Sequence, residues 1–145
     1  MKMTATEFPV TTLLTLDPIS PSILSDEVAS PSAGAIVTFC GNVRDHDHGK
    51  MVKSLQYEIH PSSSQILSET VKEVALRHNL TGIAVAHRYG EIPIGEAALV
   101  VAVAAAHRGE AFAACSELVD EIKAKIPIWK HQVFTDGTDE WVNCA

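Results

Sequence analysis

The sequence contains few cysteines and no long apolar segment. Its three cysteines are Cys40, Cys115 and Cys144, and no CxxC spacing occurs among the 145 residues. An odd count without paired spacing argues against a disulfide framework and fits a reducing compartment. Cys40 and Cys115 each lie inside an apolar run, which predicts packed structural thiols, whereas Cys144 is expected to be an exposed thiol.

The absence of a long apolar run excludes a membrane-spanning helix. The longest run is Ala97–Ala106, and its ten residues fall short of the roughly 20 that a bilayer requires. The opening residues, MKMTATEFPV, lack the apolar segment of a signal peptide. We therefore expect a soluble cytoplasmic protein with no membrane partner.

Positive charge is also scarce. Eleven Lys and Arg stand against 18 Asp and Glu, giving a net charge of −7. This balance excludes a general nucleic-acid binder, which needs a basic face to displace counterions. The phosphate-loop, GxGxxG and GxSxG motifs are absent as well. The length favours one domain over residues 1–145.

Hydropathy patterns predict alternating strands and helices, and the first 33 residues are mixed in character. Strands are expected at 10–18, 34–43, 52–60, 82–90, 97–106 and from 129 onward, and the glycine-bounded 34–43 as a central strand. Helices are expected within 20–34, over 61–79 and over 109–126, where Pro127 ends the last one. This order predicts an α+β sandwich with helices against a mixed or antiparallel sheet. Phe112 is expected in its core.

The segment KAKIPIWKH, Lys123–His131, gathers positive charge in this acidic chain. Lys125 is explained by favourable charge at a helix C-terminus and by pairing with Glu121. Lys123 and Lys130 are less well explained in this way. A lysine held against an apolar wall can act as an acid, a base or a nucleophile.

Two further segments could bind ligands. In AHRGE, His107 and Arg108 lie where a buried strand ends and a helix begins. The start of a helix favours the binding of an anion. The alternative is that these two residues only solvate the end of the strand. The segment 45–48 offers Asp and His ligands for a metal, but four consecutive residues cannot all face one ion. A solvated loop and no metal are therefore expected there.

Four segments together resemble the catalytic, or large, subunit of molybdopterin synthase. They are GAIVTFCGNVRD, AVAAAHRGEAF, IKAKIPIWKHQ and DGTDEWV, in the family's order between Gly34 and Val142. The resemblance implies an α/β-hammerhead-type α+β fold without a cofactor. It implies conversion of cyclic pyranopterin monophosphate to molybdopterin, with two sulfurs taken from the thiocarboxylated Gly-Gly tail of a small ubiquitin-like subunit. It also implies a central dimer of large subunits.

The resemblance assigns roles to particular positions. Lys123 and Lys130 match the two pocket lysines of the family. The resemblance implies that they transfer protons and stabilise charge while the bonds at the carbonyl carbon and sulfur of the tail change. The implied substrate-binding residues are Asn42, Val43, Arg44, His107, Arg108, His131 and Gln132. Many relatives have a lysine at the position of Asn42 and a glutamate at the position of Gln132. Many also have a further arginine after the WV pair, and His131 is expected to replace that arginine. The competing interpretation is a non-catalytic module that binds a ubiquitin-like tail or an anionic metabolite.

Overall fold

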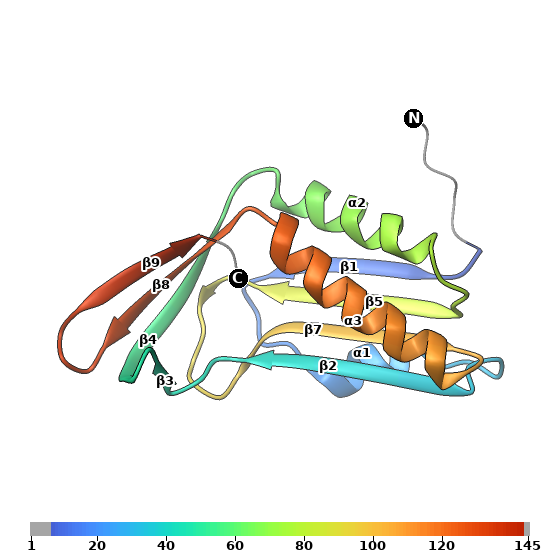
Figure 1. Cartoon of the computed structure of the whole chain (residues 1–145), viewed down its shortest axis with the longest axis horizontal. Helices are drawn as coiled ribbons and strands as arrows, with labels where there is room; N and C mark the ends of the chain where they lie inside the picture. The colour runs from blue at the N-terminus through green and yellow to red at the C-terminus, as the bar shows by residue number, and fades with distance from the viewer. Residues whose placement is uncertain (1–6, 144–145) are drawn as a thin grey trace.

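The computed structural model describes residues 7–143 and contains two β-sheets and three helices (Figure 1). The first sheet has the order β1-β5-β7-β2, and the second runs β3-β4-β8-β9 with β6 beside β4. The first sheet consists of β1 (Val10–Thr15), β2 (Ala35–Asn42), β5 (Gly82–Arg88) and β7 (Ala97–Ala105). The second consists of β3 (His46–Asp47), β4 (Lys50–Ile59), β6 (Gly90–Glu91), β8 (Ile128–Phe134) and β9 (Asp139–Asn143).

The helices cover both faces of the first sheet. α2 (Ser63–Ala75) and α3 (Arg108–Lys125) pack on one face, and the short α1 (Pro21–Val28) packs on the other. Strands β4, β8 and β9 extend beyond the helices at one end, on the left of Figure 1. This arrangement confirms the predicted α+β class.

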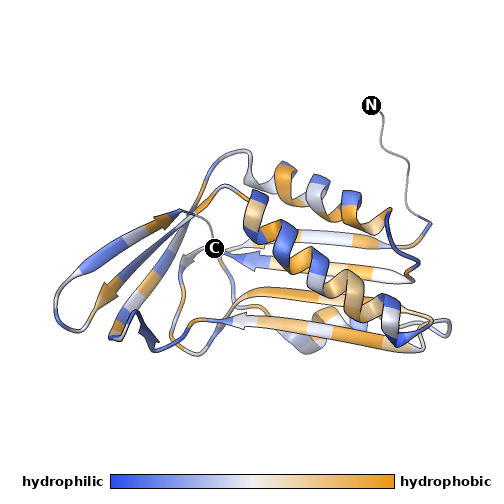
Figure 2. Ribbon diagram, viewed as in Figure 1, coloured by the Kyte–Doolittle hydropathy of each residue, from blue (hydrophilic) through white to orange (hydrophobic). Residues whose placement is uncertain are grey.

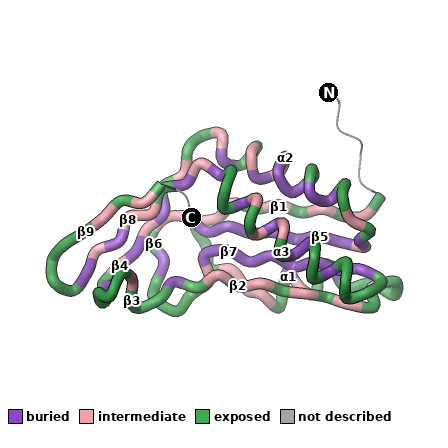
Figure 3. The backbone as a smooth tube through the Cα atoms, in the orientation of Figure 1, coloured by how far each residue is buried: buried purple, intermediate pink, exposed green. Residues whose placement is uncertain are grey.

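Strands β5 and β7 form the buried centre of the molecule (Figure 3). Eight of the nine residues of β7 are buried, as its continuous apolar run predicts, and Figure 2 shows the hydrophobic colour along this strand. β1 pairs with β5 in parallel while the other pairs of this sheet are antiparallel, so the sheet is mixed.

The prediction that residues 34–43 form a central strand is wrong in position. The strand exists, but β2 pairs only with β7 and stands at the edge of the sheet. Its residues alternate between half-buried and exposed, and Cys40 is exposed rather than packed. Cys115 is buried in α3 as expected, and burial raises the pKa of its thiol to about 11. Cys144 lies outside the described residues.

Helix α3 ends close to the predicted position because the chain turns at Pro127. The carbonyl of Pro127 accepts hydrogen bonds from the Ser63 hydroxyl (3.0 Å) and from the backbone N–H of His60 (3.2 Å). The buried stripe of the helix is Ala111, Ala114, Cys115, Leu118 and Ile122. Phe112 is not in the core as expected but 61% exposed, because it falls one position outside this stripe.

None of the helices within residues 7–143 is long and apolar enough to cross a membrane.

His87 is a titratable ring inside the core. It lies in β5 with 1% of its surface exposed, its Nδ1 2.8 Å from the carbonyl oxygen of Arg88 and its ring edge-on to Tyr57. Burial is the main cause that lowers the pKa of His87 to about 4, and the nearby charge of Lys123 lowers it further. The ring is therefore neutral at pH 7.

This buried ring predicts acid sensitivity. Between pH 6.5 and 4 the unfolded chain protonates His87 while the folded chain does not, so stability falls as the pH falls through that window. The total contribution is on the order of 3 kcal/mol. Urea unfolding at several pH values should show a shallower pH dependence for His87→Asn than for wild type. If the free energy of unfolding of His87→Asn depended on pH as steeply as that of wild type, the lowered pKa of His87 would be contradicted.

Gly34 allows a close approach at the start of β2. A Cβ at Gly34 would lie 2.2 Å from the carbonyl oxygen of Ala106, whereas a Cβ at Gly109 meets nothing within 4 Å. We expect Gly34→Ala to lower the free energy of unfolding by roughly 1–3 kcal/mol. The matched control Gly109→Ala should be neutral or slightly stabilising. Equal effects of the two substitutions in denaturant titrations would refute this explanation.

Candidate functional site

A polar pocket of about 250 Å³ lies where the end of β2, the β3–β4 hairpin, α3 and β8 come together. The residues around it include six of the nine expected from the resemblance: Asn42, Val43, Arg44, Lys123, Lys130 and Gln132. His46, Asp47, Leu55 and Tyr57 complete the lining. Its wall is thus mainly polar, with two apolar side chains, Val43 and Leu55.

The pairing of β4 with β8 sets which side chains face the pocket. Tyr57 stands opposite Lys130, and Leu55 stands opposite Gln132. Cross-strand neighbours share a face of the sheet, and successive residues of a strand alternate between faces. Lys130 and Gln132 therefore share the pocket face.

The same alternation turns His131 away from the pocket. Its ring stacks on Trp141 with centroids 4.3 Å apart, and its Nε2 lies 2.8 Å from an oxygen of Asp139. His131 is absent from the pocket lining, so the role expected for it as a replacement for an arginine has no geometric support within the described chain.

The end of β2 carries the next group of pocket residues. The pairing register with β7 shifts between Gly41 and Asn42, an irregularity of the kind that redirects side chains beside functional sites. Val43 follows as a buried anchor whose backbone N–H donates to Glu96 and whose carbonyl accepts from Gly95. Arg44 then projects from this fixed point with 65% of its side chain exposed.

The lysines of the segment Lys123–His131 have different surroundings. Lys125 pairs with Glu121 at 2.9 Å, as predicted, and also approaches Glu73 at 3.5 Å. Lys123 lines the pocket and has no acidic partner at ion-pair distance among residues 7–143. Lys123 thus brings an uncompensated positive charge to the pocket, and Lys125 does not.

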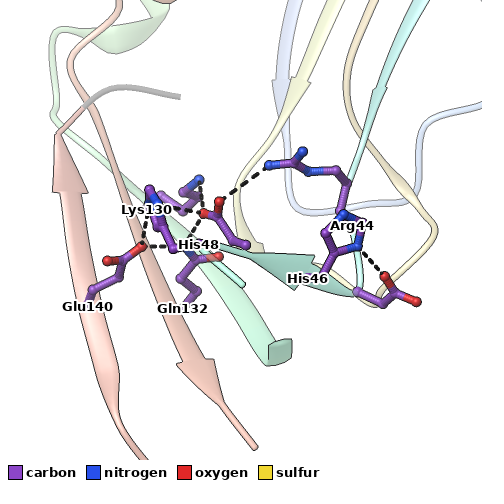
Figure 4. Close-up of polar contacts among 8 residues, drawn as sticks. Arg44, His46, His48, Lys130, Gln132 and Glu140 are labelled. Carbon is purple, nitrogen blue, oxygen red and sulfur yellow. Dashed lines mark hydrogen bonds and ion pairs between the residues drawn. The ribbon is translucent and has the colours of Figure 1, made fainter. Parts of the chain in front are cut away.

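Asp47 connects several of the pocket residues, and its partners Arg44, Lys130 and Gln132 are labelled in Figure 4. Its carboxylate lies 3.8 Å from the ammonium of Lys130 and 3.4 Å from the guanidinium of Arg44. The amide of Gln132, which is 2% exposed, donates to it at 2.6 Å. The hydrogen bond from Gln132, followed by the nearby cations, holds the pKa of Asp47 below its usual range against the opposing effect of burial.

The expected solvated loop is instead a tight hairpin beside the pocket. It joins β3 to β4, and it brings Asp47 and His48 near Glu140 of β9, with one ligand atom of each within 4.8 Å of the others. The Gln132 amide donates to both carboxylates, and Lys130 approaches Asp47 as well. Asp47 and Glu140 therefore share one amide donor, and Asp47 also faces the ammonium of Lys130.

His107 and Arg108 lie far from this pocket within the chain. They stand at the start of α3, whereas Lys123 is near its end, and 15 residues of helix span about 22 Å. Both residues are exposed, and neither lines the pocket. Phe112, one helical turn further, is exposed at the same end of α3.

A larger cavity of about 650 Å³ lies at the opposite end of the molecule, between the C-terminal ends of α1 and α2. Among the described residues that line it are two glutamates, Glu7 and Glu27, and no lysine or arginine. This lining disfavours an anion, so the smaller basic pocket is the better candidate despite its size.

The pocket chemistry suits an anionic ligand. Two lysines and an arginine can bind a phosphate or a carboxylate and stabilise an oxyanion that develops during reaction. The sequence reasoning missed Asp47, Tyr57, Leu55 and His46. The alternation in residues 52–60 could have placed Leu55 and Tyr57 on one face, but no local signal indicated that Asp47 reaches β8.

The chain is similar to several known proteins. The MoaE protein family model matches residues 14–125. A protein of Aspergillus niger named molybdopterin synthase catalytic subunit is 39% identical over 129 residues, which cover 88% of this chain and 72% of that protein. The Arabidopsis thaliana protein of the same name is 43% identical over 113 residues, which cover 77% of this chain and 57% of the Arabidopsis protein.

Solved structures agree with this family. The crystal structure of molybdopterin synthase from Staphylococcus aureus matches with a TM-score of 0.82 and 28% identity, covering 89% of this chain and 94% of that one. A complex of subunits 1 and 2 of the molybdopterin-converting factor from Helicobacter pylori shares the fold, with a TM-score of 0.68, 16% identity, and coverage of 92% and 88%. The match over 112 residues, the curated relatives and the fold show that the chain belongs to the MoaE protein family.

Proposed function

We propose that this protein is the catalytic subunit of molybdopterin synthase, a sulfurtransferase of molybdenum cofactor biosynthesis. It converts cyclic pyranopterin monophosphate to molybdopterin with two sulfurs from the thiocarboxylated C-terminus of a small ubiquitin-like subunit. The proposal includes a cytoplasmic location. The observation that carries it is the convergence of Lys123, Lys130 and Arg44 on one pocket in a chain of net charge −7.

The lysines have two tasks in this proposal. The tail and the pterin phosphate are both anionic, and the cations of the pocket hold them together despite the negative charge of the protein. As the terminal carbonyl carbon of the tail exchanges sulfur for oxygen, Lys123 and Lys130 stabilise the negative charge that develops and transfer protons. Asn42, Val43, Arg44 and Gln132 contribute to substrate binding.

His107 and Arg108 enter the same site from a second copy of the chain. Within one chain they lie about 22 Å from Lys123 along α3, too far for direct contact with the same small ligand. They stand beside the exposed Phe112 and near the start of β2, whose outer edge is unpaired among the described strands. Exposed apolar surface and a free strand edge suit an interface in a symmetric dimer.

Replacing Lys123 with alanine should remove turnover without unfolding the protein. With the thiocarboxylated partner and cyclic pyranopterin monophosphate, we expect Lys123→Ala to lower kcat by at least about 10²-fold, because it removes charge stabilisation and proton transfer. The control Lys125→Ala, two residues away on the same helix, should retain wild-type activity, since Lys125 pairs with Glu121 and Glu73 outside the pocket. Product is measured by mass spectrometry.

The same assay separates the enzyme from a binding module. Wild-type protein that binds the tail and the pterin without adding sulfur would contradict the proposed activity. Full turnover in Lys123→Ala would contradict the role proposed for Lys123 but not the proposed activity.

Subunit complementation tests the composite site. Lys123→Ala and Arg108→Ala homodimers should each be inactive, but mixing them should produce heterodimers that contain one intact site, restoring about a quarter of wild-type activity. If both residues act from the same chain, the mixture stays inactive after subunit exchange. Native mass spectrometry confirms that exchange has occurred.

A further inference from the structure

Asp47 is the one carboxylate among the described residues that line the pocket. Its side chain is 15% exposed, yet it belongs to a short hairpin at the rim of the molecule. The two turn residues, His48 and Gly49, have φ of 52° and 74°, the left-handed conformation of the tight hairpin turn that joins twisted strands. This turn pairs Asp47 with Lys50 and directs the carboxylate toward β8.

The two oxygens of Asp47 have different partners. Oδ1 lies 3.4 Å from Nη2 of Arg44, an arginine that is mostly exposed. Oδ2 lies 3.8 Å from Nζ of Lys130, a lysine that is only 20% exposed, and accepts a hydrogen bond from Gln132 at 2.6 Å. One carboxylate therefore contacts both an exposed cation, Arg44, and a largely buried cation, Lys130.

Gln132 holds this carboxylate in place. Its amide nitrogen donates to Asp47 and, at 2.5 Å, to Glu140 of β9. Because Gln132 is buried and Glu140 comes from the neighbouring strand, Asp47 is attached to the β8–β9 pair as well as to its own hairpin. The carboxylate of Asp47 is therefore held in a fixed position, from which it can orient the ammonium of Lys130.

We propose that Asp47 is a positioning residue: it holds the ammonium of Lys130 at the pocket wall and releases Arg44 when an anionic substrate arrives. The proposal rests on the proposed function for what Lys130 does, but the contact itself can be tested separately. An incoming phosphate or carboxylate competes with Asp47 for the exposed Arg44, whereas the confined Lys130 stays paired. The positive charge inside the pocket thereby keeps its orientation while the mouth binds the substrate.

The first test measures the contact without any turnover. Amine acetylation followed by peptide mass analysis gives the labelling rate of each lysine. Asp47→Asn should raise the rate at Lys130 by roughly two- to fivefold, the size of effect expected for an ion pair near the protein surface, and leave Lys125 unchanged. The control Asp45→Asn changes an exposed neighbour that pairs with His46 and does not line the pocket, so Lys130 should label as in wild type.

The second test measures catalysis in the reconstituted complex. Asp47→Asn should bind cyclic pyranopterin monophosphate as tightly as wild type or more tightly, because the pocket gains net positive charge, while kcat falls roughly tenfold. A purely structural role would weaken binding or reduce the number of binding sites. Unchanged Lys130 labelling, or unchanged kcat with wild-type binding, would overturn the proposal. If wild type forms no product, the proposed function fails, and the labelling result still decides whether Asp47 holds Lys130.

Discussion

The turn at Pro127 is the constraint on which the pocket depends. Proline ends α3, and its carbonyl is held by the buried hydroxyl of Ser63 and by the backbone N–H of His60. These bonds fasten the α3–β8 connection to the start of α2 and to the end of β4. Lys123 on the helix and Lys130 on the strand can face one pocket only because this connection is short and fixed.

Local charge within an acidic chain follows from that geometry. The pocket gathers Arg44, Lys123 and Lys130 around the single carboxylate of Asp47. Outside the pocket, Lys125 is neutralised by Glu121 and Glu73, and Lys50 approaches Asp136 at 3.2 Å. The result is a local positive site on a negatively charged protein, a charge arrangement that favours a small anionic ligand.

The sequence was most informative where hydrophobic periodicity is strong. It predicted the buried strand β7, the end of α3 and the difference between Lys125 and its neighbours. It failed where pairing partners decide the outcome: the pattern of β2 does not reveal that this strand is an edge, and nothing around Asp47 indicates its contact with β8. The position of His131 was foreseeable, because strand alternation separates it from Lys130 and Gln132. The separation of His107 and Arg108 from Lys123 follows from the length of α3.

The most direct measurement is the position of the small subunit's tail in a crystal structure of the complex. The account predicts that the terminal carbonyl of the tail enters the pocket beside Lys123 and Lys130, within about 3 Å of at least one of the two ammonium nitrogens. A tail that ends outside this pocket, with both lysines remote from its terminal carbonyl, would contradict the account.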